Sequence, residues 1–322
     1  MAAGRRAVDA VAANAVLIAV RQAANLLCDR WSLKILLALT LGARRYGEIR
    51  DRCGIANRLI TGRLRMQEES GMVVRMPYTR RPLRHEYQLT NMGLDLFGVF
   101  ATMLAWEQRR AIAAAAPRLQ VECGSCRHAV TPQLHCRACD GAVDARSIDL
   151  RVSQTGIRKM PAMDTGYRIS SAAAASHAHA AVGPLEASFD IFGDKWTVEV
   201  LICAFLRMRS FGDFNSHIGI STNILADRLS RLVARGLLRK FTTEQSQRGG
   251  AYVLTDAGMD AYPILIALQT WADDWVEDRY RSPVRLIHRA CGETLVQQLR
   301  CNLCGAALDR RNSRLNLVPA GR

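Results

Sequence analysis

An internal repeat at a constant offset of 165 residues constrains the fold of this chain more than any other feature of its sequence. The repeat runs without a gap from Asp29 to Cys139, so that Trp31 matches Trp196 and Trp106 matches Trp271. Solenoid repeats have periods of roughly 20 to 50 residues, well below this offset. The sequence therefore predicts two copies of one module, which we call copy 1 (N-terminal) and copy 2 (C-terminal).

The composition indicates a globular and basic protein. The 322 residues leave room for two domains, each with its own core. Lysine and arginine total 44 against 29 acidic residues, a formal net charge of +15. This excess favours nucleic acid or an anionic membrane surface as a partner, the alternative being a merely soluble basic protein. No apolar run reaches the ~18 residues of a membrane-spanning helix, and paired cysteines suit a reducing compartment, so we expect a cytoplasmic protein without membrane contact.

Apolar spacing in copy 1 predicts a helix-turn-helix followed by a two-stranded wing. We expect helices over residues 16–39, 46–52 and 57–69, and strands over residues 72–76 and 86–89. One long helix is expected over residues 90–115, and its counterpart over residues 256–280 is expected to be kinked by Pro263. The predicted fold class is mainly α with small β-wings (α+β).

The helix over residues 57–69 presents a candidate DNA-reading face. Ile60, Leu64 and Gln67 lie on the side that is expected to pack against the core. The opposite side carries donors that suit guanine and thymine edges or phosphates, and Gly62 allows close backbone approach. The candidate DNA contacts are Asn57, Arg58, Thr61 and Arg65. The alternative is an ordinary solvated helix face.

The equivalent face of copy 2 carries no positive charge. Its candidate DNA contacts are Thr222, Asn223, Asp227 and Ser230. Asn223 suits adenine and Asp227 suits cytosine N4, although Asp227 would also repel phosphates. Copy 2 therefore either reads a different half-site or serves a structural role, and we expect the former.

Basic residues cluster in both predicted wings and suit phosphate or minor-groove contacts. The candidates are Arg80, Arg81 and Arg84 in copy 1 and Arg239, Lys240 and Arg248 in copy 2. The alternative is a charged hairpin tip that is only solvated.

Paired cysteines follow the wing and helix of each copy. Cys123 and Cys126 are separated by nine residues from Cys136 and Cys139, so that two thiolate pairs can face each other across a small hairpin. Four thiolates suit tetrahedral zinc. At the 165-residue offset the second quartet is His288, Cys291, Cys301 and Cys304. Each copy is therefore predicted to hold one structural zinc ion with its own four ligands.

Several alternatives to these zinc sites remain open in the sequence. Disulfide bonds are the main alternative for each quartet, and His128 or His135 is an alternative ligand. His177 and His179 could also ligate metal, but the surrounding composition favours a linker. Cys53 and Cys203, outside the quartets, are expected to be buried small apolar residues.

The strings over residues 28–36, 45–50, 55–71 and 87–93 resemble the HxlR-type (MarR-like) winged-helix transcription regulators of bacteria and archaea, and the equivalent strings of copy 2 do as well. The resemblance covers about 90 residues in each copy. It implies a DNA-binding regulator that dimerises through its N- and C-terminal helices. Some relatives sense electrophiles through a cysteine well before the tryptophan, whereas Cys28 stands three residues before Trp31, so redox sensing is not expected.

The repeat and the resemblance together predict five segments. Residues 144–184 are rich in Ser, Ala, Gly and charged residues, which is typical of a flexible linker. The predicted segments are a winged helix over residues 1–116, a zinc ribbon over 117–143, the linker over 144–184, a second winged helix over 185–281 and a second ribbon over 282–312.

These patterns predict a sequence-specific DNA-binding transcription regulator, with repression as the expected mode. Double-stranded DNA is the expected partner, and the functional unit is expected to be a homodimer or an intramolecular pseudo-dimer. The alternative is a protein-interaction adaptor of the transcription machinery, with one DNA-binding and one scaffold winged helix. No phosphate-binding glycine loop, H-E-x-x-H motif or nucleophile elbow occurs, so an enzyme is not expected.

Overall fold

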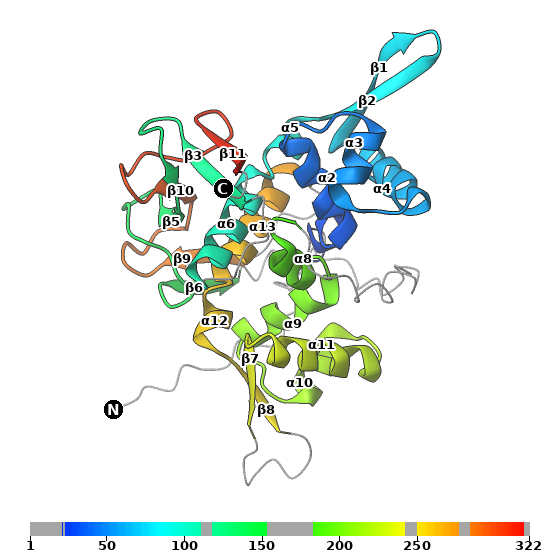
Figure 1. Ribbon diagram of the computed structural model, residues 1–322. Helices are drawn as coiled ribbons and strands as arrows, with labels where there is room; N and C mark the ends of the chain where they lie inside the picture. Colours follow the sequence, from blue (N-terminus) through cyan, green and yellow to red (C-terminus); the bar gives the residue numbers. More distant parts are fainter. Residues whose placement is uncertain are drawn as a thin grey trace, which may run out of the picture.

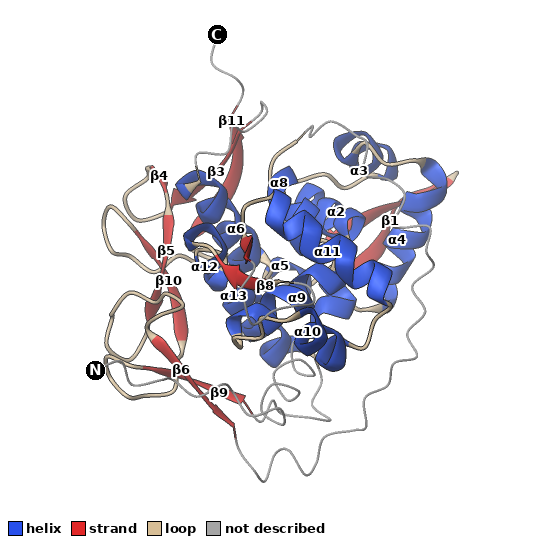
Figure 2. Cartoon of the chain, turned by 90° about the horizontal axis from the view of Figure 1, so that it is seen from below, coloured by secondary structure: helices blue, strands red, loops and turns tan. Residues whose placement is uncertain are grey.

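The computed structural model describes residues 21, 23–110, 118–152, 183–241, 250–276 and 284–318. Helices of both copies form one body, and the two β-hairpin wings extend from opposite ends of it (Figure 1). Short strands that follow the helices in each copy gather on one side, as the view from below shows (Figure 2). Among the described residues, no helix is long and apolar enough to cross a membrane.

Copy 1 folds as a helix-turn-helix with a wing. Its elements are α2 (Arg30–Thr40), α3 (Tyr46–Cys53), α4 (Asn57–Glu69), β1 (Val73–Arg80), β2 (Leu83–Leu89), α5 (Asn91–Leu94) and α6 (Phe97–Arg109). The turn between α3 and α4 depends on Gly54, which adopts a left-handed conformation (φ +63°) that favours glycine. The predicted helices over residues 46–52 and 57–69 are therefore confirmed, and the wing strands are longer than expected.

The expected helix over residues 16–39 is wrong as a single element. Residues 23–27 are helical, the chain leaves the helix at Cys28, and α2 begins at Arg30. The Asp29 carboxylate accepts a hydrogen bond from the backbone N–H of Ser32 at 2.8 Å, so Asp29 caps a new helix instead of continuing the preceding one. Residues 16–20 lie outside the described part of the chain.

Copy 2 repeats these elements at the offset of the sequence repeat. They are α8 (Glu186–Phe192), α9 (Lys195–Phe205), α10 (Phe211–Ile218), α11 (Thr222–Ala234), β7 (Leu238–Phe241), β8 (Ala251–Leu254), α12 (Asp256–Met259) and α13 (Tyr262–Trp275). Each of the helices α9 to α13 begins 165 residues after its counterpart in copy 1.

The two long helices expected after the wings are each divided in two. The chain forms the one-turn helices α5 and α12 before the longer α6 and α13. Pro263 lies in the first turn of α13, where its missing N–H leaves no helical hydrogen bond unmade. The predicted kink at Pro263 is therefore wrong, because the proline helps to start a helix instead of interrupting one.

The strands after the helices pair mainly between the two copies, and one short pair, residues 121–122 with 129–130, lies within copy 1. They are β3 (Arg118–Cys123), β4 (Ala129–Val130), β5 (Pro132–Cys136), β6 (Ile148–Val152), β9 (Val284–His288), β10 (Gln297–Cys301) and β11 (Ser313–Val318). The antiparallel pairs between the copies are β5 with β10, β3 with β11, and β6 with β9. Leu134 pairs with its own counterpart Leu299, so a pseudo-two-fold axis passes through this pair.

Strands β6 and β11 correct the expected segment boundaries. β6 falls within the region expected to be linker, and β11 lies beyond the expected end of the second ribbon at residue 312. The two strands are equivalent at the 165-residue offset, so the structural repeat extends past Cys139. The sequence signal fades there because only backbone pairing and alternating apolar side chains are needed in an edge strand.

The helices of the two copies also pack around the pseudo-two-fold axis. The Trp106 indole donates a hydrogen bond to the Ala257 carbonyl at 3.4 Å, and the equivalent Trp271 indole donates to the Met92 carbonyl at 3.0 Å. Asp29 forms an isolated β-bridge with its counterpart Asp194. Buried apolar residues of both copies form one continuous cluster. The expectation of two separate cores is thus replaced by a core that both copies share.

Candidate nucleic-acid interface and metal centres

Helix α4 presents the side that its apolar pattern predicts. Ile60, Leu64 and Gln67 are buried, and they fix the orientation of the helix against the core. The predicted DNA contacts Asn57, Arg58, Thr61 and Arg65 are all exposed, as is Gly62. The exposure of this face is therefore confirmed, while contact with DNA stays a prediction.

Local contacts distinguish the exposed side chains of α4. The Thr61 hydroxyl donates to the Asn57 carbonyl at 3.2 Å and lies 3.1 Å from the Tyr46 hydroxyl. Arg65 forms an ion pair with Glu69 at 2.8 Å. Among the described residues no hydrogen bond or ion pair engages the Arg58 guanidinium. Arg58 is thus available to a base edge, whereas Arg65 must first leave an exposed ion pair that is worth little.

Helix α11 places Thr222, Asn223, Asp227 and Ser230 on its exposed side. Leu225, Leu229 and Leu232 are buried on the other side. The Asp227 carboxylate forms an ion pair with the neighbouring Arg228. Arg228 also binds Asp194, so the three side chains keep a net charge of −1 and Asp227 still disfavours nearby phosphates.

An aspartate–arginine pair, which the sequence pattern did not single out, holds each of the helices α4 and α11 in place. Arg63 of α4 binds Asp29 at 2.9 Å, and the equivalent Arg228 of α11 binds Asp194 at 2.8 Å. Burial would raise the pKa of Asp194, but the hydrogen bonds and charge of Arg228 lower that pKa below its usual value. Asp29 also caps α2, and Asp194 caps α9. Because Asp29 and Asp194 form a β-bridge with each other, each aspartate connects α4 or α11 to the pseudo-two-fold axis. The repeat of both residues at the 165-residue offset was the signal that could have found them.

The wing of copy 1 extends a basic hairpin away from the body. Arg80, Arg81 and Arg84 are exposed beside its turn, where Arg80 pairs with Leu83. Leu83 is 63% exposed at this tip, an apolar side chain that the sequence pattern did not single out. In copy 2, Arg239 and Lys240 are exposed on β7, and Arg248 lies outside the described residues.

Two clusters of potential metal ligands form, and each takes two residues from each copy. One cluster is Cys123, Cys126, Cys301 and Cys304, and the other is Cys136, Cys139, His288 and Cys291. The predicted quartets within single copies are therefore wrong. The reason is the pairing of β5 with β10 and of β3 with β11, which brings the first cysteine pair of one copy to the second pair of the other.

The geometry of both clusters fits a tetrahedral metal ion. In the all-cysteine cluster the Sγ atoms of Cys123 and Cys304 are 3.8 Å apart, and those of Cys126 and Cys301 are 3.9 Å apart. A tetrahedral zinc ion with Zn–S bonds of ~2.3 Å separates its sulfur ligands by ~3.8 Å. The backbone N–H of Cys126 lowers the pKa of the Cys123 thiol to about 7. Burial and the neighbouring cysteines raise the pKa of Cys126 to about 11, so only part of the cluster favours the thiolate form that binds metal.

A small neighbouring residue leaves space for the histidine of the second cluster. His288 replaces the equivalent Cys123, and its Nδ1 lies 3.2 Å from the Cys139 Sγ. Gly141 lies beside the imidazole, and a Cβ atom there would stand 3.0 Å from its Cε1. The residue equivalent to Gly141 beside the all-cysteine cluster is Ala306. The larger ligand is thus matched by a smaller neighbour, as expected for a cluster that still binds metal.

The other candidate ligands lie apart from these clusters. Neither His128 nor His135 belongs to them, and the His135 Nδ1 instead lies 2.7 Å from the Asp140 carbonyl. His177 and His179 lie outside the described residues. The described cysteines form no disulfide bond. Cys53 and Cys203 are buried as expected, and burial raises the pKa of the Cys53 thiol to about 12.

Two helix-turn-helix units with basic wings define a winged-helix DNA-binding protein. The family model of the HxlR-like helix-turn-helix matches residues 26–113 and again residues 191–280. The chain therefore belongs to the HxlR-like helix-turn-helix family, and it is a DNA-binding transcription regulator with an internal duplication.

Parts of this chain are similar to individual known proteins. An uncharacterized HTH-type transcriptional regulator of Mycobacterium tuberculosis (strain H37Rv) is 33% identical over 129 residues, which cover 40% of this chain and 82% of the relative. YtcD of Bacillus subtilis is 30% identical over 90 residues, 28% of this chain and 71% of the relative. The reduced form of the regulator YodB from B. subtilis is a solved structure with 31% identity and a TM-score of 0.26, covering 28% of this chain and 88% of that one.

Proposed function

We propose that one chain forms a complete, sequence-specific DNA-binding unit that reads two non-identical half-sites. Helix α4 reads one half-site through Arg58 and Arg65, and α11 reads the other through Asn223 and Asp227. The observation that carries this proposal is the pair of unlike reading faces on one pseudo-symmetric frame. Arginine favours guanine, whereas asparagine favours adenine and aspartate favours cytosine, so unlike faces select unlike bases.

Charged residues between the two copies favour the pairing of copy 1 with copy 2 over the pairing of two identical copies. Arg21 forms an ion pair with Glu199 at 2.8 Å, and Lys34 forms one with Glu186. At the 165-residue offset, Arg21 is equivalent to Glu186 and Lys34 to Glu199. Pairing two copies 1 would therefore place Arg21 against Lys34, and pairing two copies 2 would place Glu186 against Glu199. Repulsion between partly buried like charges disfavours both arrangements.

The two metal clusters support the same arrangement. We propose that each holds one structural zinc ion, with Cys123, Cys126, Cys301 and Cys304 as one ligand set and Cys136, Cys139, His288 and Cys291 as the other. Four protein ligands leave no open coordination position, which is typical of zinc that stabilises a fold. Because every site takes ligands from both copies, zinc would connect the two winged helices and fix their separation.

The adaptor function, the second candidate, rested on Asp227 and its repulsion of DNA. Arg228 pairs with both Asp194 and Asp227, so it offsets only part of the negative charge, and the adaptor stays the second candidate. An adaptor would still bind DNA weakly and without sequence preference.

The test is to select genomic fragments with the purified full-length chain, sequence them, and footprint the enriched site. We expect an imperfect repeat whose half-sites differ, with centres about 10 base pairs or a multiple apart. Binding should survive physiological salt better on this site than on scrambled DNA. Equal, salt-labile affinity for both DNAs would refute specific reading and support the adaptor.

A further inference from the structure

A cavity with a volume of about 210 Å³ lies in copy 2 between the helices and the strands that follow them. Helices α9 and α13 form one wall, and β6, β9 and the start of β10 form the other. Most of the lining is apolar, including Ile202, Leu265, Ile266 and Leu295. The rings of Phe205 and Tyr262 meet at the cavity with centroids 5.2 Å apart. An engineered apolar cavity of about 150 Å³ accommodates benzene, so this one is large enough for one or two aromatic rings.

Two polar groups in the lining have no protein partner among the described residues. The Gln297 Oε1 atom is buried and accepts no hydrogen bond from that part of the chain. No described residue forms a hydrogen bond with the Tyr262 hydroxyl, and burial raises the pKa of that phenol well above its usual value. Leaving the buried Gln297 Oε1 atom unpaired costs about 1 to 3 kcal/mol, so a core with no further purpose would be expected to use an apolar residue there.

Copy 1 has apolar residues at the equivalent positions. Its residues equivalent to Tyr262, Gln269 and Gln297 are Phe97, Leu104 and Pro132. In copy 1 a hydrogen bond of 3.0 Å between the Thr131 hydroxyl and Gln108 also ties the strands to α6. The equivalent residues of copy 2 are Val296 and Asp273, and valine cannot form this bond. Copy 2 thus has the unpaired polar groups, and it lacks the hydrogen bond that ties the helix to the strands in copy 1.

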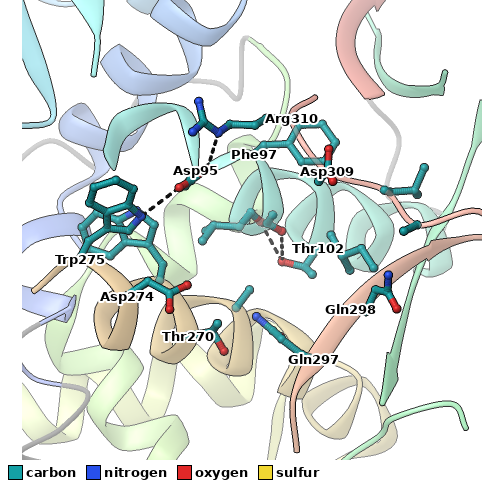
Figure 3. Close-up of a pocket in the computed structure, with 17 residues that line it drawn as sticks. Asp95, Phe97, Thr102, Thr270, Asp274, Trp275, Gln297, Gln298, Asp309 and Arg310 are labelled. Atoms are coloured by element: carbon teal, nitrogen blue, oxygen red, sulfur yellow. Dashed lines mark hydrogen bonds and ion pairs between the residues drawn. The ribbon is translucent and has the colours of Figure 1, made fainter. Parts of the chain in front are cut away.

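A neighbouring cleft of about 340 Å³ between α6, α13 and β10 differs in this respect (Figure 3). The Asp95 carboxylate accepts a hydrogen bond from the Trp275 indole at 3.1 Å and forms an ion pair with Arg310. The Asp95 carboxylate is therefore already satisfied by protein groups. Gln297 lines both spaces and separates the polar cleft from the apolar cavity.

We propose that the apolar cavity of copy 2 is an effector site for a small, uncharged aromatic alcohol of one or two rings. The ring would pack among Phe205, Ile266 and Leu295. The ligand hydroxyl would donate a hydrogen bond to the Gln297 Oε1 atom and accept one from the Tyr262 hydroxyl. Both unpaired groups would then be satisfied by one ligand atom.

The position of the cavity connects such a ligand to both readers. Phe205 ends α9, which leads through a short turn into α10 of the helix-turn-helix. Gln297 begins β10, which pairs with β5 of copy 1. An occupied cavity would fix the strands against α13 and so set the angle between the two winged helices. This coupling to DNA rests on the proposed two-reader function, whereas binding of the ligand does not.

The first experiment titrates the full-length, metal-replete chain with 2-naphthol by calorimetry in the absence of DNA. We expect one site per chain, and weaker binding of naphthalene, which lacks the hydroxyl. Tyr262→Phe, which installs the copy 1 residue, should weaken 2-naphthol binding about 5- to 10-fold, as loss of one hydrogen bond predicts. Phe97→Tyr, the matched change in copy 1, should leave it unchanged. No binding, or equal affinities for wild type and Tyr262→Phe, would overturn the site.

A second variant tests whether 2-naphthol binds in the cavity itself. Leu295→Trp fills the cavity from the strand side, and its thermal unfolding without ligand shows whether the chain still folds. A folded Leu295→Trp that no longer binds 2-naphthol supports the cavity, and one that binds as wild type does refutes it. Gel shifts with the selected DNA, with and without 2-naphthol, then test coupling. If DNA binds but 2-naphthol does not, the effector site fails while the proposed DNA function stands.

Discussion

Copy 1 and copy 2 share the residues that hold their fold together, and they differ in residues on the exposed helix faces and between the copies. The shared residues include the tryptophans Trp106 and Trp271 and the capping aspartates Asp29 and Asp194. The reading faces, the charges at the pairing surface and one metal ligand all differ. Within one chain each copy meets only its unlike partner, so substitutions that would harm a symmetric dimer are tolerated. The comparison shows how a duplicated homodimer-like unit can become two specialised halves.

The largest effect is expected from breaking the metal clusters in pairs. Cys126→Ser with Cys304→Ser removes two ligands of one cluster, whereas Cys126→Ser with Cys139→Ser removes one ligand from each. We expect the first variant to retain one zinc ion per chain and the second to lose both or hold them weakly. Zinc binding contributes roughly 10 to 16 kcal/mol in small zinc-dependent folds, so the second variant should also lose the strands around β5 and β10.

Elemental analysis and hydrogen exchange of the two cysteine variants measure this outcome. Ligand sets confined to single copies would reverse the pattern, with Cys126→Ser/Cys139→Ser retaining one ion. Wild-type chain purified under reducing conditions without zinc would contradict both arrangements.

The next effect concerns the charges that distinguish the two copies at the pairing surface. Lys34→Glu gives copy 1 the charge of copy 2 and places it against Glu186, whose side chain is 5% exposed. Breaking a buried ion pair costs about 3 to 5 kcal/mol, but Glu186 keeps its ion pair with Arg30 at 2.6 Å, so urea unfolding should show a loss below that range. Adding Glu186→Arg, which installs the copy 1 charge at the equivalent position, restores opposite charges at this pair but faces Arg30, so it should recover only part of the loss. The control is Arg50→Glu, at a half-buried arginine whose ion pair with Asp51 does not join the two copies. A loss in Lys34→Glu no larger than that in Arg50→Glu would contradict the charge argument.

Smaller effects should separate the two reading faces. Arg58→Ala should cost about 1 to 3 kcal/mol on the selected site and less on scrambled DNA, because a lost base contact affects only sequences that contain the base. Arg81→Ala should weaken both DNAs alike, since a phosphate contact carries no sequence information. Gel shifts at fixed salt measure these losses. Equal losses on both DNAs for Arg58→Ala would reassign that side chain to the phosphates.

The corresponding test in copy 2 asks whether α11 contacts DNA bases. Replacing Asn223 and Asp227 together by alanine should shrink the footprint to the half-site read by α4. An unchanged footprint would show that α11 does not read DNA and that copy 2 serves as a pairing module.

The smallest effect is a pH dependence centred on Asp194. Its pKa is lower in the folded chain than in the unfolded chain because of Arg228, so the carboxylate stabilises the fold above its usual pKa of about 3.8. That stability is lost as the pH falls through the folded pKa. Urea unfolding between pH 5 and 3 should therefore show a steeper decline in the free energy of unfolding for wild type than for Asp194→Asn, because the asparagine side chain binds no proton in this range. Parallel curves would contradict the assignment.

Local features of the fold could be predicted from particular residues. The apolar spacing of Ile60, Leu64 and Gln67, with Gly54 before the helix, defined α4 and its exposed side. Helix starts that depend on one residue were harder to predict. Asp29 and Pro263 each lie within apolar runs that continue on both sides, and only the packing shows that a new helix begins there.

The sequence alone determined that this chain holds two winged helices, which side of each reading helix is exposed, and which eight residues can bind metal. Only the tertiary structure decided how those residues group. The spacing of cysteine pairs is the same whether a pair meets its own copy or the other one, so local sequence cannot distinguish the two arrangements. Strand pairing across the axis and the unlike charges of Arg21 and Glu186 decide it, because they depend on contacts between residues more than 150 positions apart.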